Sequence, residues 1–288
     1  MLQFGLRAHD FGTLPAELLA DTLAPFHPSS IQLALSKAVS GSPTAAGFMS
    51  PGYARRLRDI FAEREIAVSV LGCYINPVHP DPNERNRGLL RFEEHLRYAR
   101  DFGCSIVGTE TGSRGADCTF HPDTEKKETF DLLCLSLERL IRTAERCASI
   151  IGVEAVAGTH TVSSIEKMQE LLRRLDSPNL QVIYDPVNLI PLTGFSESQE
   201  AFFARAFASL GQKIAAVHVK DFRMESGIKK GTLASGTGDL DYASLFRHLQ
   251  ICKPNIDVIL ENTLPSNAAD ALAFVRRLAR ETTDEKPV

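Results

Sequence analysis

Short apolar segments of strand character alternate with longer amphipathic segments along almost the whole chain, and this alternation limits the fold more than any other feature. Most of the apolar segments lack a polar residue at every second position. Such runs are expected for strands that are buried on both faces of a parallel sheet. Eight of them occur, at residues 4–8, 30–35, 67–75, 105–110, 150–156, 180–185, 215–220 and 257–262.

Segments with helical periodicity follow these strands at fairly even spacing. They lie at residues 15–26, 51–65, 88–103, 128–149, 163–176, 197–211, 242–253 and 267–281. Eight strands alternating with eight helices predict an α/β protein with a single (β/α)8 TIM barrel, which is more economical than two doubly wound domains. No linker divides the chain, so we expect one barrel domain over residues 1–281 and a polar C-terminal tail over 282–288.

The composition of the chain limits the classes of partner and the cellular compartment that we expect. The chain has 288 residues, of which 43% are hydrophobic and 24% charged, as in ordinary globular proteins with a sizeable core. The net charge is -4 and no basic face or tail is visible, which argues against nucleic acid or an anionic membrane as the main partner. Six cysteines without a CxxC pair indicate reduced thiols. With neither a signal peptide nor a membrane span visible, we expect a cytoplasmic protein.

Ionisable residues close four consecutive predicted strands. These are Glu154, Asp185, His218 and Glu261. In a TIM barrel the C-terminal ends of the strands form the active site, so these side chains should meet at one mouth. Three carboxylates would repel one another unless a cation lay among them, and one imidazole with carboxylates suits Mn²⁺, Mg²⁺, Co²⁺ or Zn²⁺. The alternative is a buried core histidine with carboxylates in salt bridges.

The ends of the other strands supply candidates for substrate binding. His9, Lys37, Asn76 and Glu110 follow or close strands one to four and are suited to sugar hydroxyls or a phosphate. Ion pairs and hydrogen bonds that line the barrel mouth are an equally good interpretation. Lys229 and Lys230 follow strand seven, where many barrels bind phosphate, although loop lysines are more often solvated.

The order and spacing of several short motifs are similar to a known group of enzymes. The motifs are GVEAVAGTHTVS, VIYDPVNLI, VHVKDF, GTGDLDY and VILENT. Together they resemble the xylose isomerase-like TIM-barrel superfamily of sugar and sugar-phosphate isomerases and epimerases. That superfamily also contains inosose dehydratases and endonuclease IV-type nucleases. The resemblance covers nearly the whole chain.

The resemblance implies a single divalent metal ion held by Glu154, Asp185, His218 and Glu261. In the ketose 3-epimerase branch two metal-bound glutamates lie on opposite faces of the substrate carbon, and the matching residues here are Glu154 and Glu261. One glutamate removes the proton next to the carbonyl and the other returns it. This chemistry is physically reasonable because a metal stabilises the enediolate that forms.

Three positions depart from the ketose 3-epimerase pattern. Asn188 stands where that branch has histidine, and His160 stands where it has glutamate. Arg223 lies one place before the position of its arginine, which here is Met224. The metal ligands therefore match while the substrate-contacting residues differ, and we expect His160, Asn188 and Arg223 to contact substrate or support the site.

Four functional interpretations follow, all with a small-molecule partner except the nuclease. The first is a metal-dependent sugar or sugar-phosphate isomerase or epimerase. The second is a lyase that dehydrates a keto-cyclitol or keto-sugar after the same proton abstraction. An endonuclease IV-type nuclease needs more histidines than the chain offers, and a barrel that only binds a metabolite has little use for two carboxylates beside a metal. Relatives of this kind often form dimers or tetramers, so a homodimer or homotetramer is an open alternative.

Overall fold

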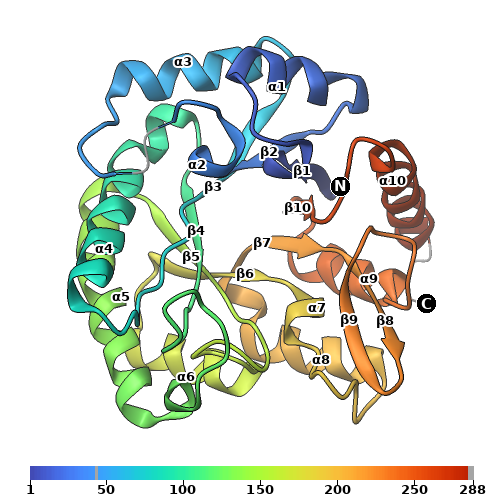
Figure 1. The fold of residues 1–288 in the computed structure, drawn as a ribbon. Helices are drawn as coiled ribbons and strands as arrows, with labels where there is room; N and C mark the ends of the chain where they lie inside the picture. Colours follow the sequence, from blue (N-terminus) through green and yellow to red (C-terminus); the bar gives the residue numbers. More distant parts are fainter. Residues whose placement is uncertain (43–44, 285–288) are drawn as a thin grey trace.

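Eight parallel strands form a closed barrel in the computed structural model, which describes residues 1–42 and 45–284. The barrel strands are β1 (Gln3–Arg7), β2 (Ser30–Leu33), β3 (Ala67–Gly72), β4 (Ile106–Glu110), β5 (Ile150–Glu154), β6 (Leu180–Tyr184), β7 (Ile214–Val219) and β10 (Asp257–Leu260). The last strand closes the barrel against the first, with Gln3 of β1 opposite Asp257 of β10. This confirms the predicted (β/α)8 barrel, in which helices surround the strands (Figure 1).

The helices lie close to the predicted segments. The long ones are α1 (Ala16–Leu23), α3 (Pro51–Ala62), α4 (Pro82–Tyr98), α5 (Lys127–Cys147), α6 (Ile165–Leu175), α8 (Gln199–Leu210), α9 (Tyr242–Cys252) and α10 (Ala268–Asp284), and the short ones are α2 (Leu35–Ala38) and α7 (Pro186–Leu189). Among the described residues, none of these helices is long and apolar enough to cross a membrane.

Hydrogen bonds at the helix ends explain where the boundaries differ. Helix α4 begins six residues before the predicted start at 88, because Asp81 Oδ1 accepts a hydrogen bond from the backbone N of Asn83 at 2.8 Å. Helix α10 continues past the predicted end at 281 to Asp284, and the hydroxyl of Thr282 donates to Leu278 O at 3.0 Å. The expected polar tail is therefore helical up to residue 284, and residues 285–288 lie outside the described part.

Small residues on β4 and β5 make room for a large side chain inside the barrel. Ile183 of β6 is buried in the interior with Val70 of β3. A Cβ on Gly152 would lie 2.8 Å from Ile183 Cγ1, and a Cβ on Gly108 would lie 2.7 Å from Ile183 Cδ1. The interior is thus packed by side chains rather than open, as in other TIM barrels.

An antiparallel hairpin follows β7 where the sequence predicted a loop. It consists of β8 (Asp221–Glu225) and β9 (Ile228–Leu233), which are drawn in orange in Figure 1. The connecting residues Ser226 and Gly227 both have positive φ, 50° and 76°, which is the conformation of a two-residue hairpin turn. A Ser-Gly pair at this position was the sequence signal for the hairpin.

Asp221 fixes the segment GTGDLDY that follows the hairpin. Its Oδ1 accepts hydrogen bonds from the backbone N of Phe222 at 2.9 Å and of Leu240 at 3.0 Å. Its Oδ2 accepts from the backbone N of Gly236 at 3.0 Å. The carboxylate therefore satisfies three backbone donors and holds this loop against the barrel.

Candidate metal centre

Four candidate ligands lie at the same end of four neighbouring barrel strands. Glu154 is the last residue of β5, Asp185 follows β6, His218 lies near the end of β7, and Glu261 follows β10. All four are buried, with exposed fractions of 3%, 1%, 0% and 3% in that order. The rule that parallel strands deliver their C-terminal residues to one mouth therefore places the four predicted side chains together.

Three of the four form a compact set. Glu154, Asp185 and His218 each offer one ligand atom, and these atoms lie within 4.8 Å of one another. Glu261 adjoins the set through His218, whose Nδ1 lies 3.3 Å from Glu261 Oε1 and 3.1 Å from Glu154 Oε2. The imidazole nitrogen thus lies between the two glutamates.

A buried lysine separates Glu261 from Asp185. Lys220 Nζ lies 2.8 Å from Asp185 Oδ2 and 2.9 Å from Glu261 Oε2, and only 7% of its side chain is exposed. On its other side Glu261 is bound by Arg7, whose Nη1 lies 2.9 Å from Oε1. The protein therefore places two fixed cations next to three carboxylates.

These contacts shift the pKa values of Glu154 and Glu261 in opposite directions. Burial is the largest influence on Glu154 and raises its pKa, although the nearby His218 opposes this. For Glu261 burial acts in the same direction, but Lys220, His218 and Arg7 outweigh it and hold the pKa well below its usual range. Burial likewise lowers the pKa of His218, and the two glutamates more than reverse this and raise it to about 9. Glu154 is therefore the carboxylate with the greater affinity for a proton.

The ring of His218 is held from its other side by a hydrogen-bonded pair. Its Nε2 contacts the side-chain oxygen of Gln32 on β2, and the amide nitrogen of Gln32 donates to the hydroxyl of Tyr74. Because an amide oxygen only accepts, Gln32 fixes the hydrogen on Nε2 and turns Nδ1 toward the glutamates. Such a partner is the usual means of orienting a metal-binding histidine.

The donor atoms fit a divalent cation. His218 Nδ1 and Asp185 Oδ2 are buried and form no hydrogen bond among the described residues, so charged neighbours alone compensate them. One imidazole nitrogen with carboxylate oxygens is a donor set for Zn²⁺, Mn²⁺, Co²⁺ or Mg²⁺. The structure thus supports a metal site at Glu154, Asp185 and His218, with Glu261 as the adjoining fourth candidate.

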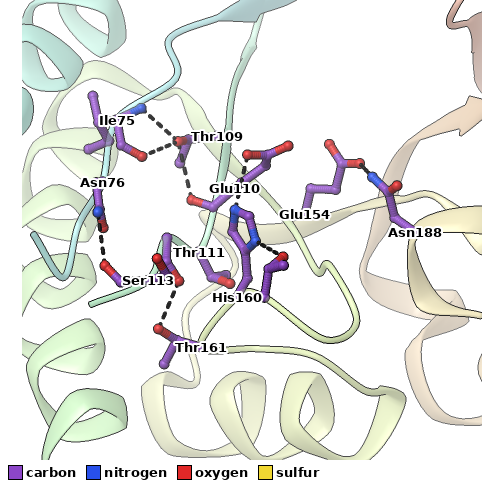
Figure 2. Close-up of polar contacts among 12 residues, drawn as sticks. Ile75, Asn76, Thr109, Glu110, Thr111, Ser113, Glu154, His160, Thr161 and Asn188 are labelled. Atoms are coloured by element: carbon purple, nitrogen blue, oxygen red, sulfur yellow. Dashed lines mark hydrogen bonds and ion pairs between the residues drawn. The ribbon is translucent and has the colours of Figure 1, made fainter. Parts of the chain in front are cut away.

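A second polar group lies beside Glu154. Glu110 of β4 is in register with Glu154 of β5, and His160 Nε2 lies 3.1 Å from Glu110 Oε2 (Figure 2). The same ring contacts the hydroxyl of Thr159 through Nδ1 at 2.8 Å. Asn188 donates from its amide to Glu154 Oε1 at 2.6 Å. His160 therefore orients Glu110, while Asn188 orients a candidate ligand.

Two further predicted residues, Lys37 and His9, pack against the ring of Tyr74 at the mouth. Lys37 Nζ lies over its ring, 4.0 Å from the centroid, and the His9 ring packs edge-on against it with centroids 6.2 Å apart. Burial, with the charges of Arg7 and Lys37 beside it, lowers the pKa of His9 to about 3. His9 is therefore a neutral ring, and Lys37 is the cation on this side of the mouth.

The side chain of Asn76 forms hydrogen bonds with backbone groups of the loops at the mouth. Its amide nitrogen donates to Ser113 O at 2.9 Å (Figure 2) and to Gly115 O at 3.1 Å, and its oxygen accepts from Val78 N at 3.2 Å. These bonds tie the loop after β3 to the loop after β4. The structure thus gives Asn76 a supporting position at the mouth, and a direct contact with substrate stays a prediction.

The hairpin residues lie apart from the ligand set. Arg223 is exposed on β8 and donates to Thr237 O at 2.7 Å. Lys229 donates to the backbone oxygens of Val187 at 2.6 Å and Ile190 at 2.5 Å, so it stabilises the end of α7. These contacts do not bring Arg223 to the metal ligands, and they give Lys229 a structural role, while a phosphate contact by Lys229 or Lys230 stays a prediction.

Three residues of the centre were missing from the predicted set, namely Lys220, Arg7 and Gln32. Side chains in a strand alternate between two faces, so Lys220 and His218, two residues apart, point the same way. Arg7 and Gln32 could be recognised in a similar way, because each is a polar residue inside an otherwise apolar strand. Alternation was therefore a usable signal that reading only the last residue of each strand overlooks.

Comparisons with known proteins agree with this geometry. The family described as a xylose isomerase-like TIM barrel matches residues 37–278. A search of curated proteins returned no match. Among solved structures, the apo 3-keto-D-glucoside 4-epimerase from E. coli superposes with a TM-score of 0.73 at 15% identity, covering 96% of this chain and 100% of that one.

Two further solved structures are similar over almost the whole chain. D-psicose 3-epimerase with D-tagatose, from Clostridium cellulolyticum H10, has a TM-score of 0.69 at 15% identity, covering 98% of this chain and 98% of that one. The IOLI protein with a bound zinc atom has a TM-score of 0.69 at 14% identity, covering 98% of both chains. At these identities the likeness establishes the fold.

Proposed function

Because the chain belongs to the xylose isomerase-like TIM-barrel family, we propose that it is a divalent-metal-dependent isomerase or epimerase of a sugar or sugar derivative. The reaction begins with removal of the proton next to a carbonyl. The observation that carries this proposal is that Glu154 and Glu261 both lie next to His218 Nδ1, at 3.1 Å and 3.3 Å. The zinc in the IOLI structure and the epimerases with the same fold support it.

In this proposal Glu154, Asp185, His218 and Glu261 hold the ion. The ion supplies Lewis acidity next to the substrate carbonyl, which makes the neighbouring proton more acidic. Asp185, Glu154 and Glu261 lie beside Lys220 and Arg7, and Asp10 also pairs with Arg7 at 2.8 Å, so the side chains of the centre carry an excess of negative charge when His218 is neutral. A divalent ion would offset this excess, and together with Lys220 it would stabilise negative charge that develops on the substrate oxygen.

In this proposal, different side chains of the protein carry out the individual proton transfers. Glu154, whose pKa burial raises, is the residue that removes the proton from one face of the substrate carbon. Asn188 holds its Oε1 at 2.6 Å, and its Oε2 lies 3.1 Å from His218 Nδ1. In this proposal Glu261 returns the proton from the opposite face, and the ammonium group of Lys220 beside it can donate a proton to the substrate oxygen or stabilise negative charge on it.

A lyase is the second candidate. It shares the proton abstraction and differs in the loss of a hydroxyl group afterwards. The pair formed by His160 and Glu110 lies beside Glu154 and is suited to protonate a departing hydroxyl. A nuclease with a three-metal cluster is disfavoured, because only one group of metal-ligating side chains occurs in the described part of the chain.

The experiment that tests the proposal is deuterium exchange followed by NMR. Protein loaded with Mn²⁺ and then stripped of free metal is incubated in D₂O with ketoses, ketose phosphates, keto-glycosides and keto-cyclitols. We expect deuterium at one carbon of one class of compound, and loss of this exchange in Glu154→Gln and Glu261→Gln. The exposed Glu128→Gln is the matched control and should exchange like the original protein.

Each outcome has a definite meaning. An isomerised product identifies an isomerase or epimerase, and a dehydrated product identifies the lyase. Undiminished exchange in both glutamine variants would rule out the two-carboxylate mechanism. Absence of exchange with every compound, with metal bound as measured by elemental analysis, would overturn the proposal as a whole.

A further inference from the structure

A large cavity lies next to the barrel mouth, and none of the four candidate ligands lines it. Its volume is about 760 Å³. It lies between the loops after β3 and β4 and the first half of α4, and its lining includes Tyr74, His79, Arg87, Leu90 and Glu110. Tyr74 and Glu110 also belong to the mouth, so the cavity continues directly from the proposed reaction site.

We propose that this cavity is a second subsite, which binds an uncharged glycosyl or aglycone unit of a keto-glycoside substrate. The keto-sugar ring then lies over the metal ligands, and the glycosidic bond passes Glu110. This inference rests on the proposed function and adds the class of substrate to it. With such a subsite, free monosaccharides and sugar phosphates are poorer substrates than uncharged glycosides.

The size of the cavity exceeds the needs of one sugar. A hexose has about twelve non-hydrogen atoms, and even at the roughly 30 Å³ that a water molecule occupies in the liquid it would fill only about half of the volume. Binding sites of about 300–1,000 Å³ typically enclose ligands of drug size. Because the reacting ring lies at the metal ligands, outside the cavity, the cavity has room for at least one further unit.

The charges around the cavity exclude a phosphate group. Glu84, Glu110 and Asp117 line it together with two basic residues, Arg87 and Arg91. Arg87 is paired with Glu84 by two contacts, the longer of which, from Nε to Oε2, measures 3.2 Å. Arg91 donates to the backbone oxygen of Tyr74 at 2.6 Å. A dianion would therefore meet an excess of carboxylates and two guanidinium groups that already bind oxygen atoms of the protein.

The remaining lining suits a neutral sugar or aryl unit. Leu90 is 44% exposed, and both Leu90 and Ile75 line the cavity. Apolar side chains of this kind pack against the C–H face of a sugar ring or against an aromatic aglycone. The carboxylates of Glu110 and Asp117 accept hydrogen bonds from hydroxyl groups, which gives orientation without requiring charge.

The test compares a keto-disaccharide with the methyl glycoside of the same keto-sugar. Deuterium exchange gives kcat/KM for both compounds, and we expect the disaccharide to exceed the methyl glycoside by at least tenfold. Leu90→Trp fills the cavity and should reduce this ratio at least tenfold. Leu135→Trp is the matched control, because Leu135 is 62% exposed on α5 and lies outside the cavity lining; its ratio should not change.

A binding measurement keeps the two proposals separable. Binding of an unoxidised disaccharide, such as maltose or trehalose, is followed by saturation-transfer NMR and needs no turnover. Binding that is lost in Leu90→Trp supports the subsite even if the reaction class is wrong. Equal kcat/KM for the two glycosides together with no disaccharide binding would overturn the subsite while leaving the proposed function intact. A ketose phosphate that outperforms the neutral glycosides would also overturn it.

Discussion

The ammonium group of Lys220 lies 2.8 Å from Oδ2 of Asp185, so a candidate metal ligand already has a cation at its oxygen. The same ammonium group lies 2.9 Å from Glu261 Oε2. Burial alone would lower the pKa of Lys220, but the two carboxylates outweigh it and raise the pKa above the ordinary value. In the absence of metal the lysine therefore acts as an internal counter-ion for two ligands.

Replacing Lys220 with methionine should strengthen metal binding. A divalent ion and an ammonium group that share carboxylates repel each other, and two unit charges about 4 Å apart interact by roughly 4 kcal/mol at a protein surface. We expect the affinity for Mn²⁺, measured by calorimetric titration, to rise at least about tenfold in Lys220→Met. Exposed Lys230→Met is the control and should bind like the original protein.

The same variant should lose stability only when metal is absent. Removing one partner of a buried ion pair typically costs about 3–5 kcal/mol, because the remaining charges are uncompensated. Added Mn²⁺ should restore most of this loss in Lys220→Met. Weaker Mn²⁺ binding in Lys220→Met would mean that the lysine supports the ligands and does not compete with the ion.

Gln32 should control metal affinity through the ring of His218. Replacing it with leucine removes the acceptor at His218 Nε2 and frees the ring to turn, which typically lowers metal affinity about 10–100-fold. Calorimetric titration with Zn²⁺ measures this loss. Gln181→Leu, at the start of β6, is the control, since Gln181 donates to Pro178 O at 3.1 Å and is exposed at this hydrogen bond. Equal affinities in the two variants would show that Gln32 does not position His218.

His160 should affect turnover without affecting metal content. Its Nε2 contacts Glu110 and not one of the four candidate ligands, so His160→Ala should bind the same amount of metal and lower the rate of exchange roughly tenfold, as expected for loss of one acid–base or positioning group. His160→Gln retains a donor and should recover part of the rate. Loss of metal from His160→Ala, measured by elemental analysis, would instead identify His160 as a ligand.

Stability should fall with acid through His95, which is remote from the metal ligands. Its Nδ1 lies 2.8 Å from Arg91 O inside α4, and burial lowers its pKa to about 4. The unfolded chain, with a histidine pKa of about 6.5, binds a proton that the folded protein does not bind. The stabilising effect is thus complete above pH 6.5 and is lost, by up to about 3 kcal/mol, as the pH falls toward 4.

Urea unfolding between pH 7 and 4 measures this dependence. His95→Gln should reduce the slope of unfolding free energy against pH over that range, and the partly buried His9, whose pKa is also lowered, should account for part of the slope that remains. The exposed His27→Asn is the control and should keep the slope of the original protein. An unchanged slope in His95→Gln would assign the acid sensitivity to other groups.

Much of the fold and of the ligand set follows from local patterns in the sequence. The apolar runs predicted the barrel strands because both faces of those strands are buried, and the barrel rule then placed Glu154, Asp185, His218 and Glu261 at one mouth. The hairpin β8–β9 was missed because its side chains alternate between partly buried and exposed positions, and lysines and glycine do not form a strong strand pattern.

The charge arrangement could not be read from individual strand ends. Alternation along the chain places Lys220 on the same side as His218, but its partners Asp185 and Glu261 follow two other strands, and a local pattern does not identify them. The bond from Gln32 to His218 likewise joins β2 to β7 across the barrel. Such contacts depend on closure of the whole barrel, which a local pattern does not specify.

The position of Arg7 has a consequence for the order in which the protein is made. It lies on the first strand, yet its guanidinium group binds Glu261 and also Asn262, which is 255 residues further along the chain. During synthesis on the ribosome, Arg7 emerges early. Nearly the entire chain must then be made before Glu261 and Asn262 are present to bind it. The charged centre is therefore among the last parts of the barrel that a growing chain can complete, after the surrounding strands and helices have had time to form.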